Sequence, residues 1–434
     1  MATSIPQELV DTIIDFLHND KLSLYNSSLV CKSWRTSAQL HLFHHVTIIV
    51  NSDSSSSLRQ FQEALETNLT IGTFVRSITL RGLMSTPPWR PDLLPLVNAP
   101  IVRILLSRLH SVQRISLESI IWEAPLVQLD TLPVTLPGQI VALSLREICS
   151  HVGPRPFLST AGAVDILQSF SSISSLDIST TVLQSDVVGE AIELASLPVL
   201  FRSLSLRNLS IHNTSHVNIF TTGLAYTNST RTLQSINIQP RLLSDGYCFG
   251  SLLSKLATDG ALRELGVHLD ADSHPLFLTL GAAERTIIPR LPALSSLKIL
   301  TIRVSTTYYS IIPFEARLAI TPRTSGLAVL PQFFHSLPPS LDTLELVVVV
   351  PDQCSDTVVR GQVYAEFLQG EEFGRGVQEL RKAGLKKIEL EVVRPESETG
   401  HDLRLTVEDG MVAALQGLPL LRRRGASSPS TSWS

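Results

Sequence analysis

Three histidines between residues 41 and 45 are spaced so that they could bind a metal ion. His41, His44 and His45 occupy positions i, i+3 and i+4, so one helical face would offer their imidazoles to zinc. No glutamate completes a His-Glu-x-x-His motif, and the group falls where a helix should give way to a strand. The segment 268–274 alternates histidine and aspartate, but it has too few oxygens for a calcium loop. We therefore expect no metal and no other cofactor.

Motifs for catalysis are also missing from the sequence. It contains no glycine-rich phosphate loop, no G-x-S-x-G elbow and no Cys/His pair at a recognisable spacing. Its four cysteines lie about a hundred residues apart, which fits neither a zinc pair nor a disulfide framework. We expect free buried thiols, no catalytic residues, and a protein that is not an enzyme.

The composition excludes several classes of protein. The 434 residues are 44% hydrophobic and 17% charged, which is typical of a folded chain rather than a disordered one. Thirty-five basic against 39 acidic residues give no overall basic surface for nucleic acid. No apolar run is long enough to cross a bilayer, and the N-terminus lacks the bases of a signal peptide. We expect an intracellular protein, cytoplasmic, nuclear or both, that binds neither nucleic acid nor a membrane.

The first fifty residues predict three short helices. Pro6 suits the first turn of a helix, and Asp20 can cap the second. A third helix follows residues 30–35. Two apolar stripes at helical spacing mark the first two helices: Leu9, Ile13, Phe16 and Leu17, then Leu22, Tyr25 and Leu29. So small a unit cannot bury much core, and it needs a partner or a neighbouring domain to cover its apolar surface.

These residues carry a resemblance to the F-box. The string Ile5-Pro6-x-Glu8-Leu9, the helix with Ile13 and Leu17, and the closing Val30-Cys31-Lys32-x-Trp34-Arg35 follow that family's pattern, with Ile5 in place of the usual leucine. The resemblance covers about a tenth of the chain. It implies docking on a Skp-type adaptor and, through it, on a cullin–RING ubiquitin ligase. Carried over by position, adaptor contact and internal packing would be divided among Ile5, Pro6, Leu9, Ile13, Leu17, Leu24, Val30 and Trp34. The alternative is that they form only the core of a helical cap.

The rest of the chain repeats a short motif: apolar, two residues, apolar, one residue, apolar. Successive copies start 28 to 44 residues apart, and helical stripes precede several of them, as at 58–69, 101–109 and 249–256. The copies start at Phe43, Val75, Val112, Ile140, Ile173, Phe201, Leu233, Leu262, Leu297, Leu341 and Leu385. The spacing predicts helix and strand in alternation.

This pattern resembles a degenerate leucine-rich repeat. The resemblance implies an α/β fold in which the three-helix F-box precedes a curved solenoid, with parallel strands on the concave face and helices outside. The units are longer than the ~20–29 residues usual in that family, and no regular asparagine follows the strand. Helix-only solenoids have repeats of similar length, but segments such as 173–180 and 341–350 alternate small polar and β-branched residues, which favours strands.

A solenoid exposes an extended binding surface. The residues between and after the last two apolar positions of each motif would line its concave face. Arginines lie in the earlier units and acids in the last two, which suggests a partner that is acidic toward the early units and basic toward the end. A generic solvated face of mixed charge is the alternative. The candidate substrate-binding residues are Arg81, Arg146, Arg207, Arg303, Glu345 and Glu389.

We therefore expect three parts: an F-box at 1–48, a leucine-rich-repeat-like solenoid at 49–420, and a disordered tail at 421–434. The function expected from the resemblance is substrate recognition for an SCF-type ubiquitin ligase, with an unidentified protein substrate on the solenoid. The alternatives are an interaction scaffold that causes no degradation, with an F-box-like helical cap, and an enzyme with a site on the concave face. Adaptor binding would separate the ubiquitin-ligase function from both alternatives.

Overall fold

A computed structural model describes about half of the chain. The described residues are 5–50, 56–82, 96–123, 140–150, 158–170, 173–179, 181, 183–184, 204–212, 218–225, 227–239, 243–270, 291, 293–305, 337–349, 375, 378–379, 382, 384–393 and 421–423. The chain divides into two compact units, Met1–Leu206 and Arg207–Ser434.

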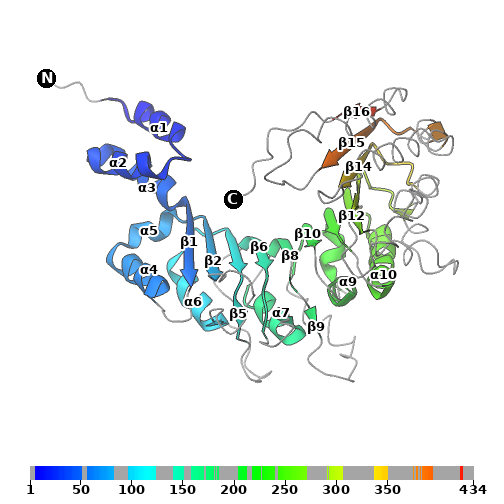
Figure 1. The fold of residues 1–434 in the computed structure, drawn as a ribbon, viewed down its shortest axis with the longest axis horizontal. Helices are drawn as coiled ribbons and strands as arrows, with labels where there is room; N and C mark the ends of the chain where they lie inside the picture. Colours follow the sequence, from blue (N-terminus) through cyan, green and yellow to red (C-terminus); the bar gives the residue numbers. More distant parts are fainter. Residues whose placement is uncertain are drawn as a thin grey trace, which may run out of the picture. The chain divides into compact units, whose positions relative to one another are not determined.

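The first unit begins with three helices and continues as alternating strands and helices (Figure 1). Its elements are α1 (Gln7–Phe16), α2 (Lys21–Val30), α3 (Lys32–His44), β1 (His45–Val50), α4 (Ser56–Thr67), α5 (Leu69–Phe74), β2 (Ser77–Gly82), β3 (Leu96–Val97), α6 (Ala99–Arg108), β4 (Arg114–Glu118), β5 (Ile121–Trp122), β6 (Ile140–Arg146), β7 (Leu158–Ser159), α7 (Thr160–Gln168), β8 (Ile173–Ser179) and β9 (Leu183–Gln184).

The second unit contains β10 (Asn208–His212), α9 (Asn218–Ala225), the 3-10 helix η2 (Asn228–Arg231), β11 (Ser235–Ile238), α10 (Leu243–Asp259), β12 (Glu264–Asp270), β13 (Ile299–Ser305), β14 (Thr343–Val349), β15 (Lys387–Val393) and β16 (Leu421–Arg423). The prediction of helices and strands in alternation is confirmed. The prediction that the strands are parallel is confirmed as well.

Parallel pairing aligns the strands of the first unit residue by residue. β1, β2, β4, β6 and β8 are neighbours in that order, with Ile78 of β2 opposite Ile115 of β4, and Ile115 opposite Leu143 of β6. All three of these side chains are buried. The apolar positions of successive motifs therefore stack into continuous rows, while the residues between them stack on the opposite face of the sheet, where Thr79 is buried and Ser116 and Ser144 are half-buried.

The second unit repeats this arrangement in β10 to β15. Leu265 of β12 pairs with Leu300 of β13, which pairs with Leu344 of β14. The apolar residue two positions later in each of these strands, Val267, Ile302 or Leu346, is also buried. So is the first leucine of each motif, at Leu233, Leu262, Leu297, Leu341 and Leu385. These three apolar rows form the core beneath the sheet.

One predicted motif is out of frame. The sequence suggested a strand starting at Phe201, with Arg207 on the outward face. Instead Leu206 is the buried first leucine, and the strand β10 starts at Asn208, in register with Ser235 of β11. The segment holds two overlapping matches, FRSLSL and LRNLSI, and only the second aligns with its neighbour. Arg207 therefore lies before the strand.

Two strands lie at the predicted domain boundaries. Strand β1 (His45–Val50) spans the boundary that we placed at residue 48, and the helix before it ends at His44. Leu421–Arg423, which we placed in a disordered tail, form β16 and pair with β15. An edge strand such as β15 offers unpaired backbone groups, and these are satisfied by the added segment. Residues 306–336 and 351–374 and the tail beyond 423 lie outside the described residues.

A matched pair of glycines tests the packing of the helices. In α5, a Cβ at Gly72 would meet the carbonyl oxygen of Arg108 at the end of α6, so Gly72→Ala must displace backbone. We expect that variant to lose about 1–3 kcal/mol of unfolding free energy. In α10, nothing lies within 4 Å of a Cβ at Gly250, so Gly250→Ala should gain about 0.5–1 kcal/mol. Chemical denaturation measures both, and a shift of the same sign in both variants would contradict this packing.

Candidate partner-binding surfaces

Helices α1, α2 and α3 pack around a small core. Four residues are fully buried there: Val10 and Ile14 of α1, Leu24 of α2 and Ala38 of α3. Partly buried Leu17, Trp34 and Leu42 pack against them. Since only one or two residues of each helix reach this core, most of the apolar residues of the three helices remain outside it.

Both predicted apolar stripes lie largely on the outside. In α1, the buried positions are Val10 and Ile14, whereas Leu9, Ile13 and Phe16 are exposed, Phe16 at 83%. Helix α1 is thus apolar on two faces. In α2, the buried apolar residue is Leu24, and the predicted stripe faces solvent. The exposed large apolar residues of this helical unit are Ile5, Leu9, Ile13, Phe16, Leu22, Tyr25, Leu29, Val30 and Leu40.

The eight predicted adaptor residues therefore divide into two groups. Leu24, Leu17 and Trp34 take part in the internal packing. Ile5, Pro6, Leu9, Ile13 and Val30 are exposed. The structure thus brings the second group to the surface and uses the first to hold the helices together.

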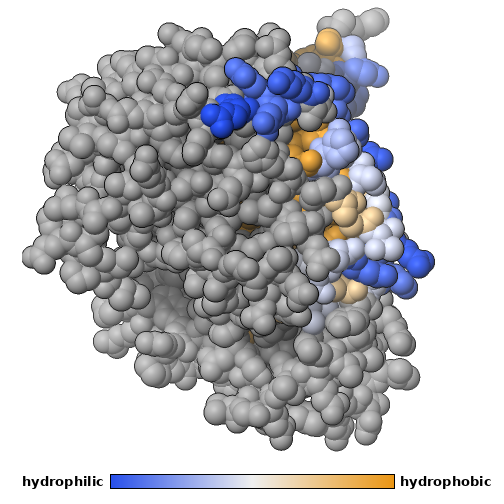
Figure 2. Space-filling view, turned by 90° about the vertical axis from the view of Figure 1, so that its right-hand side faces the viewer, coloured by the Kyte–Doolittle hydropathy of each residue, from blue (hydrophilic) through white to orange (hydrophobic). Residues whose placement is uncertain are grey.

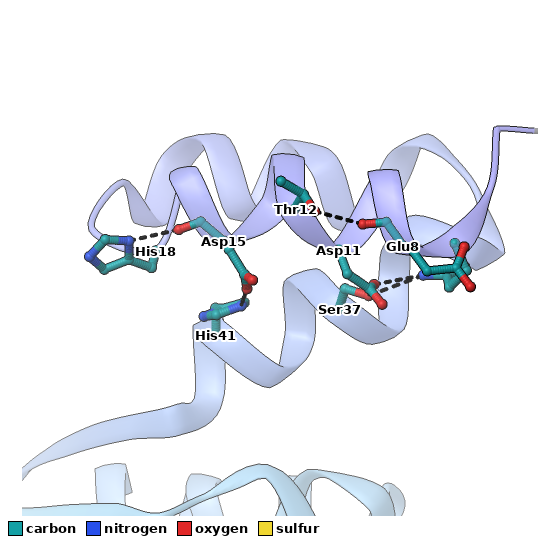
Figure 3. Close-up of polar contacts among 8 residues, drawn as sticks. Glu8, Asp11, Thr12, Asp15, His18, Ser37 and His41 are labelled. Atoms are coloured by element: carbon teal, nitrogen blue, oxygen red, sulfur yellow. Dashed lines mark hydrogen bonds and ion pairs between the residues drawn. The ribbon is translucent and has the colours of Figure 1, made fainter.

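Polar contacts fix α1 against α3 (Figure 3). Asp11 accepts hydrogen bonds from Ser37 Oγ and, at 2.8 Å, from Gln7 Nε2. One turn later, Asp15 Oδ1 lies 2.8 Å from Nε2 of His41. The two carboxylates and their two partners on α3 are each four residues apart, so both contacts form along one line of each helix. The hydrogen bonds to Ser37 and Gln7 lower the pKa of Asp11.

The start of each helix is set by a local feature of the sequence. Pro6 caps α1, and its carbonyl oxygen accepts from the N–H groups of Leu9 and Val10. The predicted cap at Asp20 is confirmed, because its Oδ1 accepts from the backbone N–H groups of Leu22 and Ser23, each at 3.1 Å. Extended backbone at Cys31 then separates α2 from α3.

Two of the three clustered histidines, His41 and His45, have hydrogen-bond partners from the protein itself. His41 pairs with Asp15, and His45 Nδ1 lies 3.0 Å from Ser77 Oγ. Burial is the largest influence on His44 and His45 and lowers the pKa of both. Among the described residues, no group of three or more His, Cys, Asp or Glu could hold a metal ion. Residues 271–274 of the second candidate lie outside the described part.

Three of the cysteines lie in the described part, and all three are free thiols. Cys149 is buried, as predicted, and burial raises the pKa of its thiol to about 11. Cys31 is exposed, contrary to the prediction, because it lies between two short helices whose core it does not reach. A contact with Ser33 Oγ is the main cause that lowers its pKa. Cys354 lies outside the described residues.

Polar side chains line the outward positions of the sheet in the first unit. Arg81 and Arg146 are exposed in the same row, on either side of Glu118 in the register. The Nε of Arg81 lies 2.6 Å from Oε2 of Glu118. In the adjacent row, Ser144 Oγ donates to Asp177 at 3.2 Å. Arg81 is thus paired with Glu118, and Arg146 lies opposite the same residue in the register, so the surface is less positive than the arginines alone suggested.

The remaining predicted substrate residues belong to the second unit. Arg303 of β13 is exposed, and Glu345 of β14 accepts a hydrogen bond from Thr301 at 3.0 Å. Glu389 of β15 is in register with Glu345. Arg207 precedes β10 and is the one candidate that is not in these outward rows.

Sequence reasoning missed several features of these surfaces. It did not identify the contacts of Asp11 and Asp15 with α3, although the four-residue spacing on both helices was a usable signal. It also did not show that the predicted stripes of α1 and α2 are exposed, because periodicity does not tell which of two apolar stripes is buried.

Comparison with known proteins adds no assignment. No protein-family model matches the chain, and no curated protein matches it significantly. No described helix is long and apolar enough to cross a membrane.

Acid should weaken the cap of α2. Hydrogen bonds from Ser23, the side chain first, lower the pKa of Asp20, so this carboxylate stabilises the folded state above the unfolded pKa of about 4. That stability is lost as the pH falls through the lower, folded pKa. Asp20→Asn keeps an acceptor but does not titrate. Circular dichroism melts between pH 7 and pH 2 should show a smaller drop in melting temperature for Asp20→Asn than for the wild type. Equal drops would contradict this role.

Proposed function

We propose that this chain is the substrate-recognition subunit of an SCF-type cullin–RING ubiquitin ligase. In this proposal, α1–α3 form an F-box that docks on a Skp-type adaptor, and the repeats form a leucine-rich-repeat-like solenoid that recruits a protein substrate. Ubiquitin transfer is then carried out by partner proteins, and this chain contributes proximity and orientation.

The observation that carries the proposal is the exposed apolar surface of α1–α3. Nine large apolar side chains are exposed there, against four that are fully buried. Soluble monomers rarely leave a large contiguous apolar surface exposed, and burying one leucine or isoleucine is worth about 1.5–3 kcal/mol. A partner that covers several of these side chains would therefore bind tightly.

The order of the exposed residues along the chain supports an F-box. Ile5, Pro6 and Leu9 at the start of α1 and Val30 at the end of α2 are exposed, and they belong to the two stretches that resemble the family most closely. Leu24 and Trp34 pack inside, as the resemblance allows. A simple helical cap would not need an apolar outer face on both α1 and α2.

The contacts between α1 and α3 support a preformed binding surface. The pairs Asp11–Ser37 and Asp15–His41 hold the two helices in one register. Side chains held in place before binding lose less conformational entropy when a partner arrives. The rim of the apolar surface is thus oriented by polar contacts that do not use any of the exposed apolar residues.

The parallel repeats support the substrate-binding part of the proposal. Their outward rows are mostly polar, with Gly266 and Val347 as exceptions, and stacked repeats of this type present an extended face to a partner. Arg81, Arg146, Arg303, Glu345 and Glu389 remain candidates on that face. The compensation of Arg81 by Glu118 favours a partner with mixed charge over a strongly acidic one at the early units.

A test is co-purification with a Skp-type adaptor. Leu9 and Ile13 are one helical turn apart on the exposed face of α1, so Leu9→Ala/Ile13→Ala removes apolar surface without touching the core. We expect this variant to bind the adaptor at least tenfold more weakly, with unchanged helical content. The control is Ile104→Ala, because Ile104 is a similarly exposed apolar residue on α6.

Each other result has a clear meaning. Wild-type binding that survives Leu9→Ala/Ile13→Ala would place the adaptor elsewhere than on α1. Absence of adaptor binding by the wild-type chain would overturn the ligase proposal and leave an interaction scaffold with a helical cap as the better account.

A further inference from the structure

A row of exposed residues runs across the second unit just before its strands. In each repeat the first leucine of the motif is buried, and the residue that follows it lies at the surface. We call these residues the N-terminal row: Arg207, Gln234, Arg263, Lys298, Asp342 and Lys386. Arg207 joins the row because its motif starts at Leu206.

Backbone hydrogen bonds hold the row in a regular order. The N–H of Gln234 donates to the carbonyl of Arg207 at 2.7 Å, and the N–H of Arg263 donates to the carbonyl of Gln234 at 2.8 Å. The same bond recurs at Lys298, Asp342 and Lys386, at 2.8, 2.9 and 3.1 Å. With neighbouring strands about 4.8 Å apart, the row spans roughly 24 Å, which is the length of about seven residues of extended peptide.

The row is strongly basic in a chain of net charge −4. Four of its six residues are cations, and one is an acid. Among the described residues, neither Arg207 nor Arg263 has an ion-pair partner. On the face that Figure 2 draws, hydrophilic residues lie beside apolar ones. The exposed guanidinium groups are therefore available to an anionic partner.

Asp342 organises the other half of the row. Its Oδ1 lies 2.7 Å from Nζ of Lys386, and its Oδ2 lies 3.6 Å from Nζ of Lys298. The lysines lie on either side of Asp342 in the row and share its single negative charge. Lys298, Asp342 and Lys386 together therefore carry a net charge of +1. This charge adds to those of Arg207 and Arg263 in the same row.

The fold does not require charge at these positions. In the first unit the same backbone bonds link His44, Arg76, Gln113 and Val141, only one of which carries a full positive charge. There the Arg76 side chain donates to the carbonyl of Ser111 at 3.2 Å, within the protein. Because equivalent positions accept neutral residues, the basic character of the second unit calls for another explanation.

We propose that the N-terminal row binds an extended acidic segment of a partner protein, with carboxylate or phosphate side chains against Arg207, Arg263 and Lys298. Arginine binds such groups through two parallel N–H donors, which gives direction as well as affinity. The inference rests on the proposed function only in taking that partner as the substrate. The N-terminal row is a different surface from the outward face of the strands, which is of mixed charge.

A protein segment fits this row better than a nucleic acid does. Proteins that bind single strands combine basic grooves with aromatic side chains on which bases stack. The N-terminal row contains no aromatic residue and has a carboxylate, Asp342, in its midst. A phosphate backbone would meet that carboxylate, whereas a peptide can place an uncharged or basic residue opposite it.

Fluorescence anisotropy with a labelled peptide of eight glutamates tests the proposal on the full chain without adaptor. We expect binding that weakens with added salt, because charge interactions are screened, and no binding of an eight-glutamine peptide. Arg207→Glu/Arg263→Glu should weaken binding at least tenfold. Asp342→Asn should strengthen it two- to fivefold, since this removes the negative charge that the two lysines share.

The matched control is Arg231→Glu/Lys255→Glu, which makes the same change in charge at exposed residues of η2 and α10 in the same unit. An equal loss of binding in the control would mean a general charge effect and would overturn the proposal. So would a labelled oligonucleotide of equal charge that binds more tightly and is equally sensitive to the two row arginines.

Adaptor co-purification with Arg207→Glu/Arg263→Glu separates this inference from the proposed function. We expect adaptor binding to be unchanged in that variant. Adaptor binding without peptide binding by the wild type would overturn the acidic-segment inference alone. Peptide binding without adaptor binding would leave the row as an acidic-segment site and overturn the ligase proposal.

Discussion

Residue-by-residue parallel pairing of the strands is the constraint on which most of this structure depends. Once Ile78, Ile115 and Leu143 are paired, every other position of their repeats is aligned as well. The three apolar positions stack into buried rows, and the residues between the last two stack into a row on the opposite face of the sheet. A slip of one residue would bury the polar row and expose the leucines, so the apolar burial and the hydrogen bonds favour the same register. The two candidate substrate surfaces are consequences of this alignment.

The helical unit at the N-terminus obeys a different constraint, which is its size. Three helices of ten to thirteen residues enclose a core of four fully buried side chains. Their apolar content is larger than this core can hold, so the surplus lies on the outer faces of α1 and α2. Polar contacts between α1 and α3 then help to hold the helices together. The same shortage of interior volume thus produces both the exposed apolar surface and the need for Asp11 and Asp15.

The two regions suit two kinds of recognition. The apolar side chains of α1 and α2 favour a partner that stays bound, because their burial removes a large area from water. The rows of the repeats present charges and hydroxyl groups, whose contribution depends on salt and on a matching arrangement of charge. The proposed recognition subunit would need one durable contact and one selective contact. The division of apolar and charged surface between the helices and the repeats is consistent with that need.

The sequence by itself determined the kinds of element and their order. Periodicity in apolar residues was enough for α1–α3 and for most strands, because each motif has a single frame. It was not enough at residues 201–211, where two overlapping frames exist and only the pairing with β11 selects Leu206. It could not tell which stripe of α1 is buried, since Val10 and Ile14 form a stripe as regular as Leu9 and Ile13. Tertiary structure decided both cases, because register and burial depend on what lies opposite a residue, and that neighbour is distant in the sequence. The N-terminal row arises in the same way: its residues are 27 to 44 positions apart in the chain and become neighbours only through the strands.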